Sequence, residues 1–167
     1  MPKILLTFIL IFNFYNKVYS SGFIGNEYIQ NLSELDCLKF AIGETQPDII
    51  FHLAAQPLVL DAYADTYSTF ATNVMGLINL FEAIKVCKSK PTIINVTTDK
   101  VYENLEKQNY FKENDKLGGK DIYSASKAAC EILCESYFQS FLKAKNIYLD
   151  TARAGNIVGG GDFGKDR

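Results

Sequence analysis

The 167-residue sequence has no tryptophan, one histidine, and no region where charge of one sign accumulates. Its 17 Lys and Arg residues nearly balance 19 Asp and Glu residues, which leaves a formal net charge of −2. Proteins that bind nucleic acids or anionic membranes by electrostatics need a basic patch, so we expect neither kind of partner. The hydrophobic fraction of 48% and the charged fraction of 22% indicate a single globular domain over residues 1–167.

Cysteines are few, and none is spaced from the only histidine, His52, as metal ligands are. The four cysteines are Cys37, Cys87, Cys130 and Cys134. The last two lie four residues apart on a predicted helix. We therefore predict no metal site, and buried or unreactive thiols in a reducing compartment.

A long hydrophobic run is also missing. The apolar segment Ile4–Phe12 is too short to cross a bilayer, and Asn13 follows it directly. Lys3 before the segment and Ser20 after it imitate a signal peptide, so secretion is one alternative. Our interpretation is a segment that packs into a core, because the rest of the chain favours a cytoplasmic protein.

From residue 31 onward, apolar runs alternate with helical patterns. Three short apolar runs predict buried strands at 49–55, 92–97 and 146–152. Apolar residues at helical spacing predict helices over 66–86 and 124–144. The alternation predicts an α/β fold with a doubly wound, Rossmann-like parallel sheet and helices on both faces.

A further helix is predicted ahead of the first of these strands. Asn31 and Ser33 are both candidates for its N-cap, and Leu35 and Leu38 begin its apolar face. Pro47 is expected to end it.

Polar residues follow each predicted strand at its carboxyl end. These are His52 and Gln56, then Thr97 to Lys100, then Arg153 to Asn156. Ligands of doubly wound sheets bind at this edge, so the sequence predicts one site built from all three groups.

The segment "YSASK" (123–127) places Tyr123 and Lys127 on one face at the start of a predicted helix. A tyrosine hydroxyl has a pKa of about 10, and a neighbouring ammonium lowers it toward neutrality. Tyr123 is therefore a candidate base for a sugar hydroxyl while hydride leaves the same carbon. The alternative is an ordinary helical pair, because Tyr-x-x-x-Lys occurs by chance in many helices.

Five segments together resemble a known family over residues 46–167. They are "FHLAAQPLV" (51–59), "TFATNVMGLINLFEA" (69–83), "NVTTDKVYEN" (95–104), "YSASK" (123–127) and "ARAGNIVGGGDFGKDR" (152–167). This pattern resembles the extended short-chain dehydrogenase/reductase superfamily (NAD-dependent epimerases and dehydratases), and within it the CDP-glucose 4,6-dehydratase family. The resemblance implies NAD as cofactor and a nucleotide sugar as substrate.

The resemblance also implies catalytic roles. Tyr123 would be the base on the sugar 4-hydroxyl, with Lys127 as its activator and a ribose contact. Thr98 would hydrogen-bond the 4-oxygen, and Asp99 would protonate the departing 6-hydroxyl. Lys100 stands where relatives that act on other nucleotide sugars have Glu, and would remove the proton from carbon 5. An ammonium shielded from water near another cation loses its proton more readily. For "TTDK" (97–100) the alternative is a helix-capping or turn cluster.

Binding residues follow from the same resemblance. The expected cofactor contacts are Asn31, Leu53, Ala54, Ala55, Thr97, Tyr123 and Lys127. The expected substrate contacts are Gln56, Arg153 and Asn156. Full-length relatives are expected to form homo-oligomers.

The glycine-rich phosphate loop of the family has no clear counterpart. Gly22–Gly25 supplies only two glycines, and we interpret it as a chance match, the alternative being a true phosphate loop. Residues 16–20 then align with the family's second strand and residues 27–35 with its third. Residues 4–12 become the remnant of the first helix, so the first strand and its loop are expected to be missing and residues 1–30 to look irregular.

The sequence also ends before the family's C-terminal substrate-binding region. We therefore expect a partial NAD-binding domain with weak or no NAD binding, whose activity alone is low or absent. The predicted reaction is the lyase conversion of CDP-glucose to CDP-4-keto-6-deoxyglucose, in deoxysugar and lipopolysaccharide O-antigen synthesis. The alternatives are another nucleotide-sugar epimerase, reductase or decarboxylase, or a non-catalytic fragment or secreted binding domain.

Overall fold

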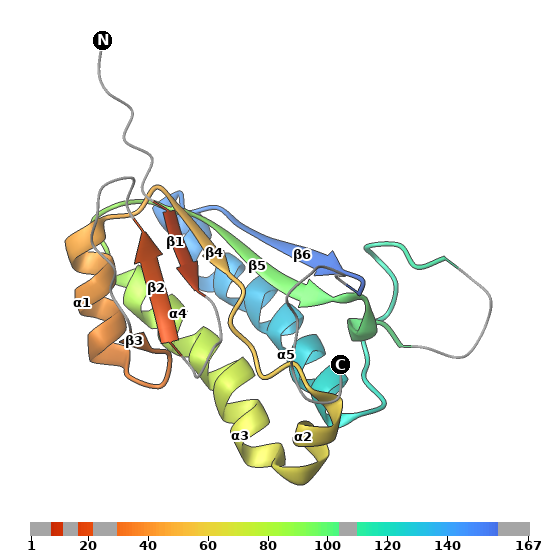
Figure 1. Ribbon diagram of the computed structural model, residues 1–167. Coiled ribbons are helices and arrows are strands. Elements are labelled where there is room, and N and C mark those ends of the chain that lie inside the picture. Colours follow the sequence, from red (N-terminus) through yellow and green to blue (C-terminus); the bar gives the residue numbers. More distant parts are fainter. Residues whose placement is uncertain (1–7, 12–16, 22–29, 104–109, 157–167) are drawn as a thin grey trace.

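The computed structural model describes residues 8–11, 17–21, 30–103 and 110–156 (Figure 1). Its side chains are described from Leu32 onward within these ranges. A six-stranded sheet has the order β3-β2-β1-β4-β5-β6. The strands are β1 (Phe8–Ile11), β2 (Lys17–Ser21), β3 (Gln30–Asn31), β4 (Ile49–His52), β5 (Thr92–Thr98) and β6 (Leu149–Ala154).

Four neighbouring strands, β1, β4, β5 and β6, run parallel, which confirms the predicted Rossmann-like sheet. Each pair of these parallel strands is bridged by chain that crosses back over the sheet, as parallel pairing requires. The strands β2 and β3 differ from the prediction, because β2 pairs antiparallel with β1 and β3 antiparallel with β2. A close antiparallel neighbour needs only a short connection, and β1 and β2 are separated by few residues.

The N-terminal segment corrects two expectations. The sequence predicts a helix remnant over residues 4–12, but Phe8–Ile11 forms β1, and Ile11 pairs with His52 of β4. A short apolar run has no helical period to decide its structure, and the backbone of β4 offers it hydrogen-bonding partners. The place beside β4 therefore contains a strand, and residues 1–30 are not irregular throughout. Gly22–Gly25 lies outside the described residues.

The helices occur along the chain in the predicted order, and the structure gives the residues at which each begins and ends. They are α1 (Leu35–Thr45), α2 (Val59–Ala64), α3 (Thr66–Phe70), the π-helical turn η1 (Ala71–Met75), α4 (Gly76–Lys85), the 3₁₀ turn η2 (Asp99–Val101), α5 (Ile122–Tyr137), and the turns η3 (Phe138–Leu142) and η4 (Lys143–Lys145). The predicted helices over 66–86 and 124–144 are confirmed, and each contains one π-helical turn.

The cap predicted for α1 is wrong. Its N-cap is Glu34, without a side-chain capping bond, rather than Asn31 or Ser33. Asn31 is still in extended pairing with Lys17, so the chain turns into the helix later than the capping pattern indicated. The other end is closed by Gln46, which adopts a left-handed conformation and donates its backbone N–H to Ile42.

Three helices, α1, α4 and α5, pack against the same face of the sheet. Their buried apolar side chains join those of β4 and β5 in one core, which includes Leu38, Ile42, Ile50, Leu80, Phe81, Ile84, Ile93, Cys130 and Cys134. The buried residues of β4 and β5 alternate along each strand, so the described helices cover one face. Both thiols on α5 are free and buried, which confirms that prediction.

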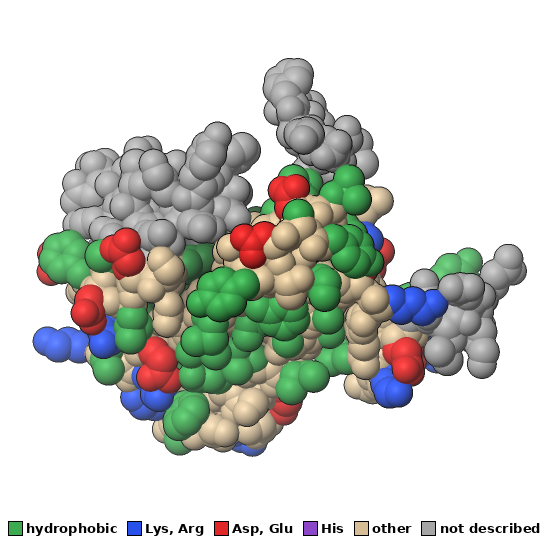
Figure 2. Space-filling model, turned by 90° about the horizontal axis from the view of Figure 1, so that it is seen from below, with side chains coloured by type: hydrophobic (Ala, Val, Ile, Leu, Met, Phe, Trp, Pro, Cys, Tyr) green, Lys and Arg blue, Asp and Glu red, His purple; other side chains and the backbone are tan. Residues whose placement is uncertain are grey.

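Apolar side chains also reach the surface, away from this core. Figure 2 views the molecule from below and shows hydrophobic side chains gathered across the middle of that face. Large side chains of α2, α3 and η1 are exposed, namely Leu60, Tyr63, Tyr67 and Met75. These helices lie at the lower end of the molecule in Figure 1.

The strand predicted at 146–152 begins later, at Leu149. Asn146 ends η4 in a left-handed conformation, and only then does the chain extend. This shift has a consequence for the site, because Arg153 lies inside β6, paired with Thr97, and not in the loop that follows.

Candidate functional site

The carboxyl ends of β4, β5 and β6 meet at one edge of the sheet, as the sequence predicts (Figure 1). β4 ends at His52, β5 at Thr98 and β6 at Ala154. The helix α5 packs against β5, β6 and the turn η2 that follows β5. The predicted polar groups are thereby collected around the start of α5.

Thr98, Asp99 and Lys100 form a compact group at the end of β5. The ammonium of Lys100 lies 3.5 Å from a carboxylate oxygen of Asp99, and the Thr98 hydroxyl donates to that same oxygen at 3.2 Å. Lys100 also donates to the side-chain oxygen of Asn156 at 3.3 Å. The structure therefore brings together three predicted catalytic residues and one predicted substrate contact.

The capping alternative for this segment is also realised. Thr98 is the N-cap of η2, and its hydroxyl accepts the backbone N–H of Lys100 at 3.4 Å. A capping role and a catalytic role are compatible here, because the cap fixes the direction in which Asp99 and Lys100 leave the strand.

Asp99 and Lys100 are more exposed than their predicted roles require. Their side chains are 52% and 44% exposed, while Thr98 is buried. The described residues thus do not shield Lys100 from water. A nucleotide sugar bound over them would have to provide that shielding.

Tyr123 and Lys127 lie one turn apart at the start of α5, which Asp121 caps by accepting the backbone N–H of Ser124 at 2.9 Å. Tyr123 is half-buried. Lys127 is buried, and its ammonium donates to the backbone oxygen of Val96 at 3.2 Å. Burial lowers the pKa of Lys127 from its ordinary value.

His52, at the end of β4, is buried on the same side of the sheet. Burial, with a smaller contribution from the charge of Lys127, lowers the pKa of His52 from 6.5 to about 3. Its Nδ1 atom has no hydrogen-bond partner among the described residues. The imidazole is therefore neutral near pH 7.

The loop after β4 is held by a buried amide that was not among the predicted residues. Asn73, in η1, accepts the backbone N–H of Gln56 at 2.7 Å and donates to the Ser126 hydroxyl at 2.8 Å. Ser126 in turn donates to the backbone oxygen of Tyr123 at 2.7 Å. The signal available in the sequence was a polar residue on the apolar face of the helix at 66–86.

The remaining predicted binding residues are placed as follows. Gln56 donates from its side chain to Thr69 at 3.0 Å, so its amide is engaged within the chain. Ala54 and Ala55 are buried directly after β4, and Leu53 is half-buried. Asn31 lies in β3.

Thr97 and Arg153 face a carboxylate rather than open space. The Thr97 hydroxyl donates to Glu131 of α5, and the guanidinium of Arg153 lies 2.9 Å from the other oxygen of Glu131. Glu131 was not predicted from the sequence. Its signal was an acidic residue on the buried face of α5, one turn after Lys127.

No group of three or more His, Cys, Asp or Glu side chains within the described ranges is arranged to hold a metal ion. Among the same residues, no helix is long and apolar enough to span a bilayer.

Comparisons with known proteins give a consistent family. The family model described as GDP-mannose 4,6 dehydratase matches residues 27–151. The chain is 39% identical over 145 residues to the CDP-glucose 4,6-dehydratase of Salmonella typhimurium, which covers 84% of this chain and 40% of that protein.

Two solved structures are similar in fold and sequence. RMD from Pseudomonas aeruginosa, complexed with NADPH, has a TM-score of 0.69 and 27% identity, over 81% of this chain and 45% of that one. The UDP-glucose 4-epimerase of Thermus thermophilus, in complex with NAD, has a TM-score of 0.66 and 26% identity, over 74% and 39%. The chain thus spans less than half the length of each of these proteins.

Proposed function

The chain belongs to the GDP-mannose 4,6 dehydratase family, and from that premise we propose that it is part of an NAD-dependent dehydratase that converts CDP-glucose to CDP-4-keto-6-deoxyglucose. The observation that supports this most is the pairing of Lys100 with Asp99 beside Asn156 at the end of β5. A base and an acid side by side suit the removal of water across two adjacent carbons. The 39% identity to a CDP-glucose enzyme favours the cytidine nucleotide.

NAD fits the described residues at the ends of β4 and β5. Ala54 and Ala55 are buried and extend no further than a methyl group, so a flat cofactor can approach the backbone there. Lys127 would contact the ribose. When bound there, NAD would supply the hydride chemistry that links carbon 4 and carbon 6 of the sugar.

The first proton step belongs to Tyr123. In the proposed reaction its phenolate removes the proton of the sugar 4-hydroxyl, and Lys127 stabilises the phenolate by its charge. Thr98 would donate a hydrogen bond to the 4-oxygen. Its hydroxyl now points at Asp99, so it would rotate toward substrate.

Elimination needs a neutral amine at Lys100 and a protonated carboxyl at Asp99. The two groups are 3.5 Å apart, so one proton moved from the ammonium to the carboxylate produces both. Lys100 then removes the proton from carbon 5, and Asp99 gives its proton to the departing 6-hydroxyl. Both residues are then ionised. When hydride returns to carbon 6, Lys100 gives its proton back to carbon 5. Its amine then regains a proton through solvent, to which Tyr123 loses the proton taken from the 4-hydroxyl.

We also propose a cellular location, an oligomeric state and a pathway for the protein. We place the chain in the cytoplasm, where NAD and nucleotide sugars occur, as one domain that binds neither nucleic acid nor membrane. The complete protein would be a homo-oligomer in deoxysugar synthesis. NAD binding by residues 1–167 alone is proposed to be weak.

The test is turnover of CDP-glucose by the 167-residue chain at saturating NAD, followed by the absorbance of the 4-keto product in alkali. We expect slow product formation that Lys100→Met abolishes. Lys116→Met, which breaks an exposed ion pair with Glu103, is the matched control and should leave the rate unchanged. Product from GDP-mannose or UDP-glucose but not from CDP-glucose would refute the proposed substrate.

A further inference from the structure

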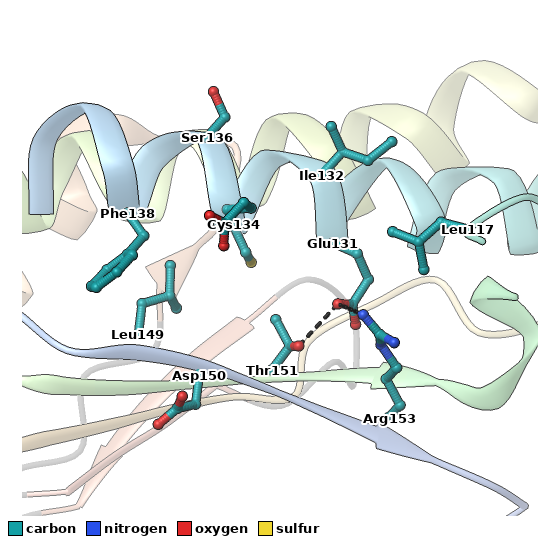
Figure 3. Close-up of a pocket in the computed structure, with 11 residues that line it drawn as sticks. Leu117, Glu131, Ile132, Cys134, Ser136, Phe138, Leu149, Asp150, Thr151 and Arg153 are labelled. Carbon is teal, nitrogen blue, oxygen red and sulfur yellow. Dashed lines mark hydrogen bonds and ion pairs between the residues drawn. The ribbon is translucent and has the colours of Figure 1, made fainter. Parts of the chain in front are cut away.

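A buried carboxylate on α5 binds side chains of two strands, β5 and β6. Glu131 is 3% exposed and accepts hydrogen bonds through both oxygens. One oxygen accepts the hydroxyl of Thr97 in β5, and the other accepts Thr151 of β6 at 2.9 Å and Arg153 at 2.9 Å. Figure 3 shows Glu131 reaching from α5 toward Thr151 and Arg153.

The guanidinium of Arg153 bonds Glu131 on one side and Tyr102 and Glu113 on the other. One terminal nitrogen bonds Glu131, and the other donates to the hydroxyl of Tyr102 at 3.0 Å and to the backbone oxygen of Glu113 at 2.8 Å. The guanidinium also lies over the Tyr102 ring, 4.9 Å from its centroid. Tyr102 stacks in turn on Phe111, at 4.7 Å between ring centroids.

The position of these contacts along the chain is informative. Thr97 directly precedes Thr98, Asp99 and Lys100, and Tyr102 follows them after one residue. The segment between is thus held at its beginning through Glu131 and at its end through Arg153. Glu131 and Arg153 are themselves joined as an ion pair, in which Glu131 is buried and Arg153 is half-buried.

We propose that Glu131 and Arg153 are positioning residues that fix the segment Thr98–Lys100 from both ends. The inference rests on the proposed function, in which Asp99 and Lys100 exchange protons with substrate. Catalytic groups lose much of their effect when displaced by about 1 Å. Because Asp99 and Lys100 are exposed, their positions depend on neighbouring residues that fix the backbone of the segment.

A groove lies beside this ion pair and is partly lined by it. It has a volume of about 610 Å³ and lies between α5 and β6, lined by residues such as Ile132, Phe138 and Leu149. None of Thr98, Asp99, Lys100 and Tyr123 lines it. Glu131 and Arg153 therefore line this groove, while the proposed catalytic residues lie outside it.

Residues of similar shape at positions 131 and 153 cannot form all the hydrogen bonds that Glu131 and Arg153 form. A glutamine at 131 presents one NH₂ group that cannot accept a hydrogen bond, so either Thr97 or the Thr151–Arg153 side loses its acceptor. A lysine at 153 keeps its charge but not the fork that reaches Glu131 and Tyr102 together.

The test compares backbone amide hydrogen exchange by NMR in the 167-residue chain and its variants, and needs no turnover. Glu131→Gln should accelerate exchange at residues 98–101 by about tenfold, the equivalent of one lost buried hydrogen bond. Tyr102→Phe, which removes one oxygen atom and preserves the fold, should accelerate the same amides less. Arg153→Lys should lie between them.

The matched control is Glu82→Gln on α4. Glu82 also accepts from a cation and a hydroxyl, namely Lys85 at 2.9 Å and Tyr137 at 2.9 Å, and these partners belong to α4 and α5 rather than to β5, η2 or β6. Its variant should leave exchange at 98–101 unchanged. Equal acceleration in both variants, or none in a folded Glu131→Gln variant, would overturn the proposal.

Kinetics separate this inference from the proposed function. Where the chain turns over CDP-glucose, Glu131→Gln should lower kcat about tenfold or more and change KM little, since it moves groups that act in the transition state. An unchanged kcat would overturn the positioning role. A wild-type chain that converts GDP-mannose or UDP-glucose but not CDP-glucose refutes the proposed function, while the exchange experiment still decides the structural inference.

Discussion

Two charged side chains lie one turn apart on α5 and have opposite surroundings. Lys127 and Glu131 are both buried. Lys127 donates to one backbone oxygen, that of Val96. Glu131 accepts from three side chains on two strands.

We call Lys127 and His52 the Lys127 region, and Glu131 with Thr97, Thr151 and Arg153 the Glu131 region. The first provides groups for the proposed chemistry. The second holds the segment Thr98–Lys100 in position. A buried group with few partners costs stability, and it persists where a ligand or a reaction makes use of it. A buried ion pair with every oxygen occupied determines position instead. The Lys127 region faces the proposed cofactor side, and the Glu131 region faces β6. Four predictions test this contrast, ordered by the size of the effect.

The largest effect is expected from Arg153→Met. This change leaves the Glu131 carboxylate buried without its cation, and such a loss costs about 3–5 kcal/mol of unfolding free energy. Urea unfolding followed by circular dichroism measures it.

The control for that prediction is the double variant Glu131→Leu/Arg153→Met. Removing both charges avoids the unpaired carboxylate, so it should recover a large part of the loss. A double variant no more stable than Arg153→Met would show that the Glu131 region is not an ion-pair network of the kind described.

The second prediction concerns acid and His52. Its folded pKa of about 3 lies below the unfolded value of 6.5, so the unfolded chain takes up the proton first as the pH falls. The stability from the neutral ring is complete above pH 6.5 and is lost down to about pH 3, at roughly 1.4 kcal/mol per pH unit.

His52→Asn removes this titration while keeping a small polar group. The difference in unfolding free energy between wild type and variant should shift by about 2–3 kcal/mol over two pH units below 6.5. If the free energy of unfolding falls equally with pH in both proteins, burial does not lower the pKa of His52 and the prediction is wrong.

Lys127→Met tests the same region from the other direction. Exchanging a buried ammonium that has one hydrogen bond for an apolar chain of similar length should raise stability by about 1 kcal/mol or more. The proposed turnover should vanish at the same time. Thermal unfolding and the CDP-glucose assay, run on one preparation, check both. A loss of stability would mean that Lys127 stabilises the fold, as Glu131 and Arg153 do, and would contradict the prediction.

The smallest effect concerns the start of α5. Asp121→Ala removes the cap on Ser124 and should cost about 1 kcal/mol, with faster amide exchange around Tyr123. Asp65→Ala is matched, because Asp65 caps Ser68 of α3 at the same 2.9 Å. It should lower stability by a similar amount without affecting Tyr123, and an identical exchange pattern in both variants would contradict the prediction.

Several features could be predicted from the sequence because they depend on neighbours in the chain. Apolar runs at 49–55 and 92–97 and helical spacing over 66–86 determine those elements locally, and β4, β5 and α4 confirm them. The grouping of Thr98–Lys100 near α5 also followed, since parallel strands end at a common edge. The predicted roles of these residues stay predictions.

Tertiary structure decided the rest. Residues 8–11 have no period that distinguishes helix from strand, and pairing with β4 made them a strand. The sequence does not reveal a partner for Arg153, and its place in β6 opposite Thr97 brings it within 2.9 Å of Glu131. Such partners lie far apart in sequence, so their choice depends on which buried charges and backbone groups the fold brings together and must satisfy.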